Sequence, residues 1–300
     1  MIFFRPKGGL CNRMKALNTM LQLVENKNIT VVWVNDEEMN CNLSSLFEMA
    51  AFDNVKIIEF SRFTNILNKW KCKLLNYMED TDNQFIRKLL FRILIKNISI
   101  NDFLLNKDLR RMYDSIGNVR NQILRETDAN FSQKIKVQLQ ETISNNCYIS
   151  SCYSMTNIDT HYQKFKPINE LQDKINITTT QFSQTIGLHI RQGDHEISKE
   201  MSTFEKFEKV IQKELMKNNE STFFVATDSD DVKQKLIEKY KQKIITNSIS
   251  SFNRSSQKAI ESAVIDLYCL SKTEKIYGSH FSTYTQVAAD IGGIEDEIVK

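Results

Sequence analysis

The alternation of apolar and polar positions at the start of the chain predicts an α/β arrangement. Residues 2–4 form a short apolar run that ends at a pair of glycines, and residues 14–24 repeat apolar positions at helical spacing. Residues 29–34 (ITVVWV) form a nearly continuous β-branched run, which is typical of a strand buried on both faces of a parallel sheet. Residues 55–60 predict a third strand.

Residues 63–139 follow a helical but irregular pattern with few turn residues. Within them, residues 85–96 (FIRKLLFRILIK) mix Arg and Lys with Leu, Ile and Phe. We interpret this segment as a core helix. Contact with a membrane surface is the alternative that such a mixture leaves open.

The second half of the chain alternates predicted strands and helices. The strands are expected at residues 186–190, 223–227, 244–246 and 275–277, and the helices at 204–217, 232–241, 257–270 and from residue 282. This order predicts a mostly parallel sheet with helices on both faces. A polar stretch around Pro167 favours a boundary between two domains, residues 1–170 and 171–300.

Composition narrows the class of protein. The chain has 300 residues, of which 41% are hydrophobic and 26% charged, so it should fold as an ordinary globular protein. Forty Lys and Arg against 37 Asp and Glu give a net charge of +3 with no basic block, which argues against a nucleic-acid-binding protein. The six cysteines are scattered singly, without zinc-site spacing, and favour a reducing compartment. With neither a signal peptide nor a membrane span in the pattern, we expect a cytoplasmic protein, or one at the membrane periphery.

Candidate chemistry gathers where the predicted C-terminal strands end, which is where open parallel sheets bind ligands. The polar residues after three of these strands are His189, Arg191, Asp194 and His195; Thr227, Asp228, Ser229 and Asp230; and Ser279, His280, Ser282 and Thr283. An Arg guanidinium presents a planar fork of donors, and the helix start at Ser282–Thr283 offers free backbone N–H groups. Together these groups predict a pyrophosphate site, although a Ser-Thr pair at a helix start is also an ordinary N-cap.

At these residues the chain resembles the superfamily of α1,2-, α1,6- and protein-O-fucosyltransferases. Four short segments carry the resemblance: residues 8–13 (GGLCNR), like the family's glycine-rich first loop; 189–194 (HIRQGD), like its H-x-R-R-x-D motif; 224–229 (FVATDS), like a strand ending in Thr-Asp; and 266–271 (DLYCLS) with 278–285, like the closing region. Their order and spacing also fit the family.

The resemblance implies a GT-B-like fold, with two Rossmann-like domains and a helical insertion in the N-terminal half. It implies that residues 171–300 hold GDP-fucose, that residues 1–170 form the acceptor side, and that the acceptor is a glycan in the cleft. Arg191 would neutralise the leaving β-phosphate without a metal ion. The donor-binding residues carried over by position are Gly9, Asn12, Arg13, His189, Arg191, Asp194, Asp228, Asp266, Ser282 and Thr283.

An inverting transfer also needs a general base. The resemblance assigns that role to Glu200, with Glu196 and His195 as rivals. Two departures from the family pattern leave the linkage unassigned: Gln192 replaces a second Arg, and His195 stands where the α1,6 branch often has Lys. For Gln192, a solvated side chain and a contact to the donor are both open.

Two other functions fit parts of the same sequence. The Asp228-Ser229-Asp230 stretch is a D-x-D at a strand end, which in metal-dependent transferases of GT-A type holds a divalent cation on the donor diphosphate. A non-catalytic nucleotide- or carbohydrate-binding module is the second alternative, with Gln192 as the altered position. Turnover that depends on Mn²⁺ would favour the first, and binding without turnover the second.

Overall fold

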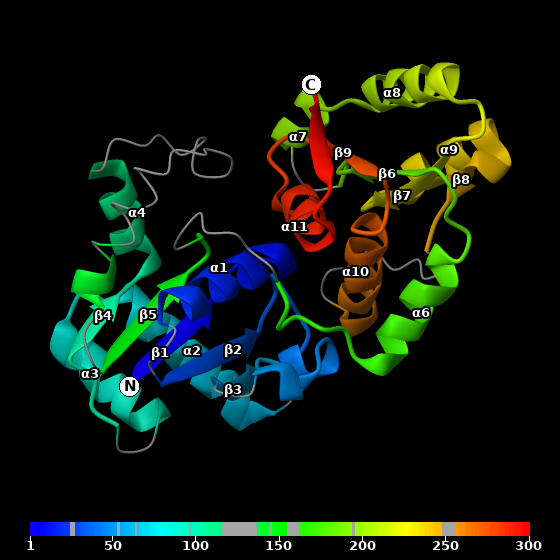
Figure 1. Ribbon diagram of the computed structural model, residues 1–300. Helices are drawn as coiled ribbons and strands as arrows, with labels where there is room; N and C mark the ends of the chain where they lie inside the picture. Colours follow the sequence, from blue (N-terminus) through cyan, green and yellow to red (C-terminus); the bar gives the residue numbers. More distant parts are fainter. Residues whose placement is uncertain are drawn as a thin grey trace. The chain divides into compact units, whose positions relative to one another are not determined.

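The structure, a computed structural model, divides the chain into two compact units, Met1–Thr160 and His161–Lys300 (Figure 1). It describes residues 1–24, 28–52, 55–63, 65–95, 98–115, 137, 139–143, 146–154, 162–193, 196–247 and 256–300. Each unit contains one sheet of parallel strands with helices packed on it, so the predicted α/β class is confirmed.

The sheet of the first unit has the strand order β3-β2-β1-β5-β4 in the described residues. Its strands are β1 Ile2–Pro6, β2 Ile29–Asn35, β3 Val55–Ser61, β4 Asp102–Leu104 and β5 Cys147–Ser151. All the neighbouring pairs are parallel. Every residue of β1, β2 and β5 is buried, as expected of central strands covered on both faces. The three strands predicted from the pattern are confirmed, whereas β4 and β5 were not predicted.

The helices that accompany this sheet include α1 Leu10–Leu23, α2 Ile66–Asp80, α3 Gln84–Leu94 and α4 Asn106–Ser115, with short 3-10 turns at Leu43–Ser45 and Met49–Phe52. The predicted helical character of residues 63–139 is confirmed for α2, α3 and α4. Residues 116–136 of that stretch lie outside the described residues.

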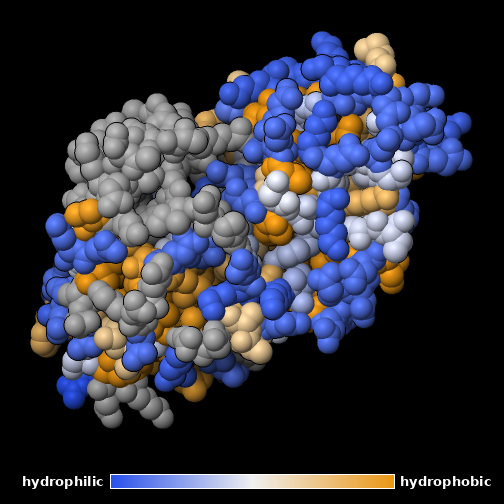
Figure 2. All heavy atoms as spheres, viewed as in Figure 1, coloured by the Kyte–Doolittle hydropathy of each residue, from blue (hydrophilic) through white to orange (hydrophobic). Residues whose placement is uncertain are grey.

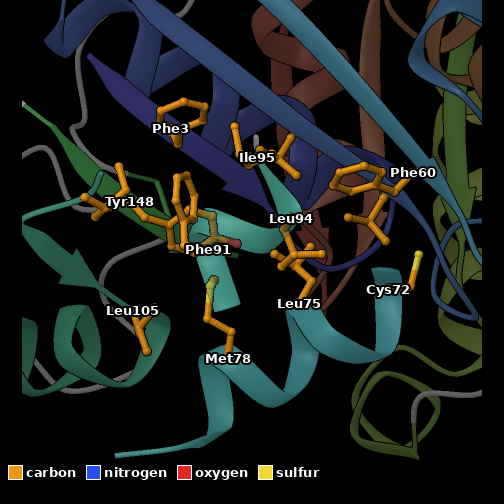
Figure 3. Packing of buried hydrophobic residues seen from close by; sticks show 13 residues of the cluster. Phe3, Phe60, Cys72, Leu75, Met78, Phe91, Leu94, Ile95, Leu105 and Tyr148 are labelled. Atoms are coloured by element: carbon orange, nitrogen blue, oxygen red, sulfur yellow. The ribbon is translucent and has the colours of Figure 1, made fainter. Parts of the chain in front are cut away.

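Helices α2 and α3 share one core cluster with the sheet (Figure 3). The ring of Phe91 on α3 meets Phe3 of β1 edge-on at 4.9 Å and Tyr148 of β5 at 5.6 Å. Leu75 and Met78 of α2 are buried in the same cluster. One face of residues 85–94 is therefore core, as predicted.

The sheet of the second unit has the order β10-β9-β6-β7-β8, again with only parallel neighbours in the described part. Its strands are β6 Thr185–Ile190, β7 Thr222–Thr227, β8 Ile244–Ile245, β9 Lys275–Ser279 and β10 Glu295–Val299. Its helices are α6 Asn169–Thr179, α7 Glu196–Met201, α8 Phe204–Lys217, α9 Asp230–Tyr240, α10 Gln257–Leu270 and α11 Thr283–Gly292, with a 3-10 turn at Lys241–Lys243. Helices α8 and α10 begin and end at the predicted residues, whereas β10 was not predicted.

Close packing of α11 on β9 depends on one glycine. A Cβ atom at Gly278 would lie 2.1 Å from Thr285 Oγ1, so the helix could not approach a larger residue this closely. Because the strands are parallel, the carboxyl ends of β6, β7 and β9 meet at one edge of the sheet, and α11 begins there.

The two units differ in their surfaces on the face that Figure 2 draws. Among the coloured atoms, the first unit shows broad apolar areas, whereas the second is mainly hydrophilic. Within the described residues, no helix has both the length and the apolar character needed to cross a bilayer.

Candidate functional site

Five predicted site residues or their neighbours lie at the carboxyl edge of the second sheet. We call this group the strand-end site: His189, Arg191, Asp228, Ser279 and Ser282. They come from β6, which is central, and from the strands β7 and β9 on either side of it. The structure thus brings together the three polar clusters that the sequence placed after separate strands.

His189 is held in place from two directions. Its side chain is buried, and Nδ1 lies 2.8 Å from Thr285 Oγ1 in a hydrogen bond. The imidazole also stacks on the Tyr284 ring, with centroids 4.7 Å apart and an interplanar angle of 27°. His189 therefore ties β6 to the first turn of α11.

The turn after β6 is organised by Asp228. Backbone N–H groups of Gln192 and Gly193 donate to Asp228 Oδ1 at 2.7 and 2.8 Å, and the N–H of Arg191 donates to Ser279 Oγ at 2.9 Å. A Cβ atom at Gly193 would lie 2.7 Å from Asp228 Oδ2, so this close turn needs glycine. Asp228 thus fixes the backbone that carries Arg191.

Gln192 has a structural contact that the sequence did not suggest. Its side-chain amide donates to the backbone carbonyl of Ser202 at 2.7 Å. Ser202 Oγ in turn accepts from the N–H of His280 at 2.8 Å. Gln192 therefore links the turn after β6 to the end of α7.

The Asp228-Ser229-Asp230 stretch forms a strand-to-helix junction. Ser229 is the N-cap of α9, and its Oγ accepts from the N–H of Val232 at 3.4 Å. Asp230 is the first residue of that helix, where a negative charge is favourable. In the part of the chain that the structure describes, no group of three or more His, Cys, Asp or Glu side chains is arranged to hold a metal ion.

Ser282 stands at the N-cap of α11, but its side chain makes no capping hydrogen bond. Its Oγ is buried and has no hydrogen-bond partner among the described residues. An N-cap serine ordinarily accepts from a backbone N–H of its own first turn. The start of a helix is a favourable place for an anion, so the uncapped Ser282 marks a candidate anion-binding position at this edge of the sheet.

Asp266 lies on α10, beside Asn247 and near Lys233. Burial raises the pKa of its carboxyl to about 7, against the opposing effects of the Lys233 charge and a hydrogen bond with Asn247. Its Oδ1 is sealed from solvent with no hydrogen-bond partner among the described residues. A buried carboxyl with a pKa shifted this far is a candidate member of a functional site.

The sequence pattern did not identify Asn247 as a candidate site residue. Asn247 follows β8 by two residues. Its side-chain Nδ2 donates to Ser262 Oγ of α10 at 3.2 Å, and its backbone carbonyl accepts from Lys233 Nζ of α9 at 3.0 Å. The rule that located the other clusters, polar residues after strand ends, applies to this position as well.

The candidates in the first unit surround a glycine turn. Gly8 has a φ of +86°, a left-handed conformation that suits glycine, and Gly9 is the N-cap of α1 with open space around its Cα. Asn12 packs against Gly8. Arg13 is fully buried: Nε donates to the carbonyl of Gly8 at 2.6 Å, and Nη2 to Asp36 Oδ1 at 2.7 Å. Burial lowers the pKa of Arg13 despite that carboxylate.

Glu200 is an exposed residue of α7. Asp194 and His195 lie outside the described residues.

Two parallel sheets, one in each unit, define a two-unit α/β protein with a glycine turn after β1 in the first unit and polar residues at the strand ends of the second. No protein-family model matches the chain, and no curated protein matches it in sequence. Solved structures do match it in fold.

The chain is similar to NodZ alpha-1,6-fucosyltransferase co-crystallised with GDP, with a TM-score of 0.56 and 14% identity over 96% of this chain and 91% of that one. For the fucosyltransferase NodZ from Bradyrhizobium the TM-score is 0.57 and the identity 14%, over 96% of this chain and 91% of that one. For POFUT1 in complex with GDP-fucose the TM-score is 0.51 and the identity 10%, over 99% of this chain and 97% of that one. The likeness spans nearly the whole of each chain and establishes the fold.

Proposed function

We propose that this protein is a glycosyltransferase that transfers fucose from GDP-fucose, with inversion, to a glycan acceptor. The observation that carries the proposal is Ser282: a buried hydroxyl at a helix start that caps nothing, at the same sheet edge as Arg191. Such a site suits a diphosphate. The fold neighbours that were crystallised with GDP or GDP-fucose support the choice of nucleotide.

The architecture we propose is GT-B-like. The second unit, within the expected residues 171–300, holds the donor, and the first, within residues 1–170, forms the acceptor side. Helices α2 to α4 represent the helical insertion of the first unit. The parallel sheets and the fold neighbours support this assignment.

The leaving diphosphate is stabilised by protein groups and needs no metal ion. Arg191 supplies two directed donors to the β-phosphate, while Ser282 and Thr283 supply the helix start. His189 and Asp228 hold these groups in position through Thr285 and through the turn at Gln192. Fixed donors aimed at the developing charge are an effective way to stabilise a transition state.

We assign Asp266 to recognition of the guanine ring of the donor. Guanine presents a ring N–H and an exocyclic amino group side by side, and a carboxylate can accept from both. The unpartnered Oδ1 of Asp266 supports this role. Neither uracil nor cytosine offers the same pair of donors.

The remaining candidates have subsidiary roles. Glu200 is the proposed general base, because the resemblance places an acidic residue there and the side chain is exposed. Asp194 is proposed to contact the donor. Gly9 and Asn12 would contribute from the glycine turn of the first unit, and Arg13 by holding that turn through Gly8.

The test is to measure binding of GDP, UDP and CMP by calorimetry and release of GDP from GDP-fucose with glycan acceptors. We expect GDP to bind tightest and its release to require an acceptor. Tighter binding of UDP or CMP would exclude the donor assignment. GDP binding without turnover on any acceptor would favour a non-catalytic module, and turnover that requires Mn²⁺ would favour the GT-A-type alternative at Asp228-Ser229-Asp230.

A further inference from the structure

Exposed apolar side chains are concentrated on two adjoining helices of the first unit, α2 and α3. Eight of the large exposed ones in the described residues fall between positions 63 and 93: Phe63, Ile66, Leu67, Trp70, Tyr77, Phe85, Leu89 and Ile93. We call these eight residues the α2–α3 face. Single exposed apolar residues are normal on a protein surface, but a concentration of this kind marks an interaction site.

The spacing shows that each helix carries a stripe. On α3, Phe85, Leu89 and Ile93 recur every four residues and are 75%, 48% and 59% exposed. On α2, Ile66 and Trp70 are 78% and 61% exposed at the same spacing. Residues four apart lie on one side of a helix, so each stripe is continuous.

These stripes are not needed for the core. Helix α2 already buries Leu75 and Met78, and α3 buries Phe91 and Leu94, in the cluster drawn in Figure 3. Both helices therefore have a second apolar side in addition to the one that packs on the sheet. Packing among the described residues of the unit does not account for it.

Exposed basic side chains outnumber exposed acidic ones around the stripes, and Asp82, in the turn between the two helices, is paired with Arg87 and Lys107. Lys69 and Lys73 of α2 and Lys88 and Arg92 of α3 are exposed. The acidic residues of the two helices lie at the end of α2, where Glu79 is buried in ion pairs with Arg5 and Lys7, and Asp80 is exposed. Asp80 is thus the one exposed acidic side chain on these two fully described helices.

We propose that the α2–α3 face docks on an anionic lipid membrane. A surface helix with an apolar stripe and flanking Lys and Arg is suited to the boundary between head groups and acyl chains. Trp and Tyr, which have an apolar ring and a polar atom, are favoured at that boundary. The exposed basic side chains would attract the negative charge of the lipid surface.

Trp70 offers a direct probe. The chain has two tryptophans, and the other, Trp33, is fully buried with its indole N–H donating to the carbonyl of Cys41 at 2.9 Å. Vesicle-dependent fluorescence changes will therefore come mainly from Trp70. The full chain is titrated with vesicles of phosphatidylcholine alone or with about 30% phosphatidylglycerol, which supplies the anionic charge that the exposed Lys and Arg side chains would attract.

We expect the protein to bind the anionic vesicles, with a blue shift of Trp70 emission and quenching of that emission by brominated acyl chains. Binding should be weaker in about 0.5 M salt, which screens the charges. Sedimentation measures how much of the protein partitions onto the vesicles. The double variant Trp70→Gln/Leu89→Gln should lower that partition coefficient by about tenfold or more. Lys73→Glu/Arg92→Glu should reduce it similarly and keep the Trp70 reporter.

Matched controls come from the second unit. Met216→Gln changes a residue that is 82% exposed, and Lys209→Glu/Lys213→Glu reverses two exposed charges on the same helix, α8. Both controls should bind vesicles like the wild type.

Unchanged binding by the α2–α3 variants, or no binding to either vesicle, would overturn the proposal. A different result would overturn it as well: light scattering shows a wild-type dimer, Trp70→Gln/Leu89→Gln is a monomer, and vesicles leave the Trp70 emission of the wild type unchanged. The α2–α3 face would then bind a second copy of the chain.

Discussion

His189 Nδ1 lies 2.8 Å from Thr285 Oγ1, so one hydrogen bond joins the carboxyl end of β6 to the first turn of α11. Arg191 follows β6, and α11 begins after Ser282. The bond therefore controls the spacing between the proposed phosphate-binding guanidinium and the helix start. Its removal tests whether that spacing matters.

The substitution Thr285→Val keeps the shape of the side chain but removes the hydroxyl. Because the His189 nitrogen would lose its buried partner, we expect a loss of about 1 kcal/mol or somewhat more in the free energy of unfolding. GDP affinity should also fall, since the imidazole and α11 would no longer be held together. Urea denaturation and calorimetry measure the two effects, with Thr180→Val at an exposed position as the control. Unchanged stability and affinity would show that the bond has no such role.

Gly278→Ala tests the contact between β9 and α11. The added methyl group would lie within 2.1 Å of Thr285 Oγ1 and 2.4 Å of its Cγ2, so α11 must move outward. Overpacking of this kind typically costs about 1–3 kcal/mol. We expect a lower thermal midpoint and weaker GDP binding together.

The matched control is Gly9→Ala. Gly9 has an ordinary φ of −71°, and no atom lies within 4 Å of the place that an alanine methyl group would take, so its replacement should lower the thermal midpoint much less. A thermal midpoint for Gly278→Ala equal to that of Gly9→Ala would contradict the packing argument.

Much of the fold could be predicted because its elements carry strong local patterns. Residues 29–34 are buried throughout, and their β-branched run identifies β2. Helix α10 was predicted end to end because its apolar positions recur at helical spacing. By contrast, β10 (EDEIV) is polar at an edge of its sheet, and β4 has three residues, so neither has a clear strand pattern.

The candidate site was predictable only in part, because strand ends mark an edge but not the contacts within it. The sequence placed Arg191 and Ser282 at that edge. It did not show that Gln192 would bind the carbonyl of Ser202, or that Asn247 would lie beside Asp266, since each contact joins residues of different elements. Their donor-binding roles stay predictions.

The raised pKa of Asp266 makes stability depend on pH. Its pKa is about 7 in the folded protein and 3.8 ordinarily. Between these values the unfolded chain has lost a proton that the folded protein keeps, so this group makes the protein less stable as pH rises from about 4 to 7. Asp266→Asn should remove that dependence and raise the thermal midpoint at pH 8. The exposed control Asp173→Asn should not change it.

GDP binding should respond to the same carboxyl in the opposite direction. The ionised form accepts both guanine donors, so GDP affinity of the wild type should increase from pH 6 to pH 8, with proton release measurable by calorimetry in buffers of different ionisation enthalpy. Asp266→Asn should weaken GDP binding and reduce the proton release to the part that comes from the GDP phosphate itself, whose second pKa is about 6. An affinity that is independent of pH in the wild type would remove Asp266 from the base-binding role.

Arg191 is the residue on which the proposed mechanism depends most. Departure of GDP leaves negative charge on the β-phosphate, which a bound metal or a fixed cation must neutralise. Arg191→Lys keeps the charge but loses the planar fork, and we expect turnover to fall on the order of a hundredfold or more. Arg191→Ala should be slower still, and the surface substitution Arg62→Lys should have no effect.

The decisive measurement is GDP release with acceptor present, in EDTA and in Mn²⁺, for the wild type and these variants. If Arg191 and the start of α11 together stabilise the leaving group, EDTA leaves the wild-type rate unchanged and Mn²⁺ does not restore Arg191→Ala. The backbone of the turn is held by Asp228 and Ser279 independently of the side chain at position 191, so the substitutions should leave the thermal midpoint nearly unchanged. A rate for Arg191→Ala close to that of the wild type, or loss of wild-type activity in EDTA, would show that another cation does this work.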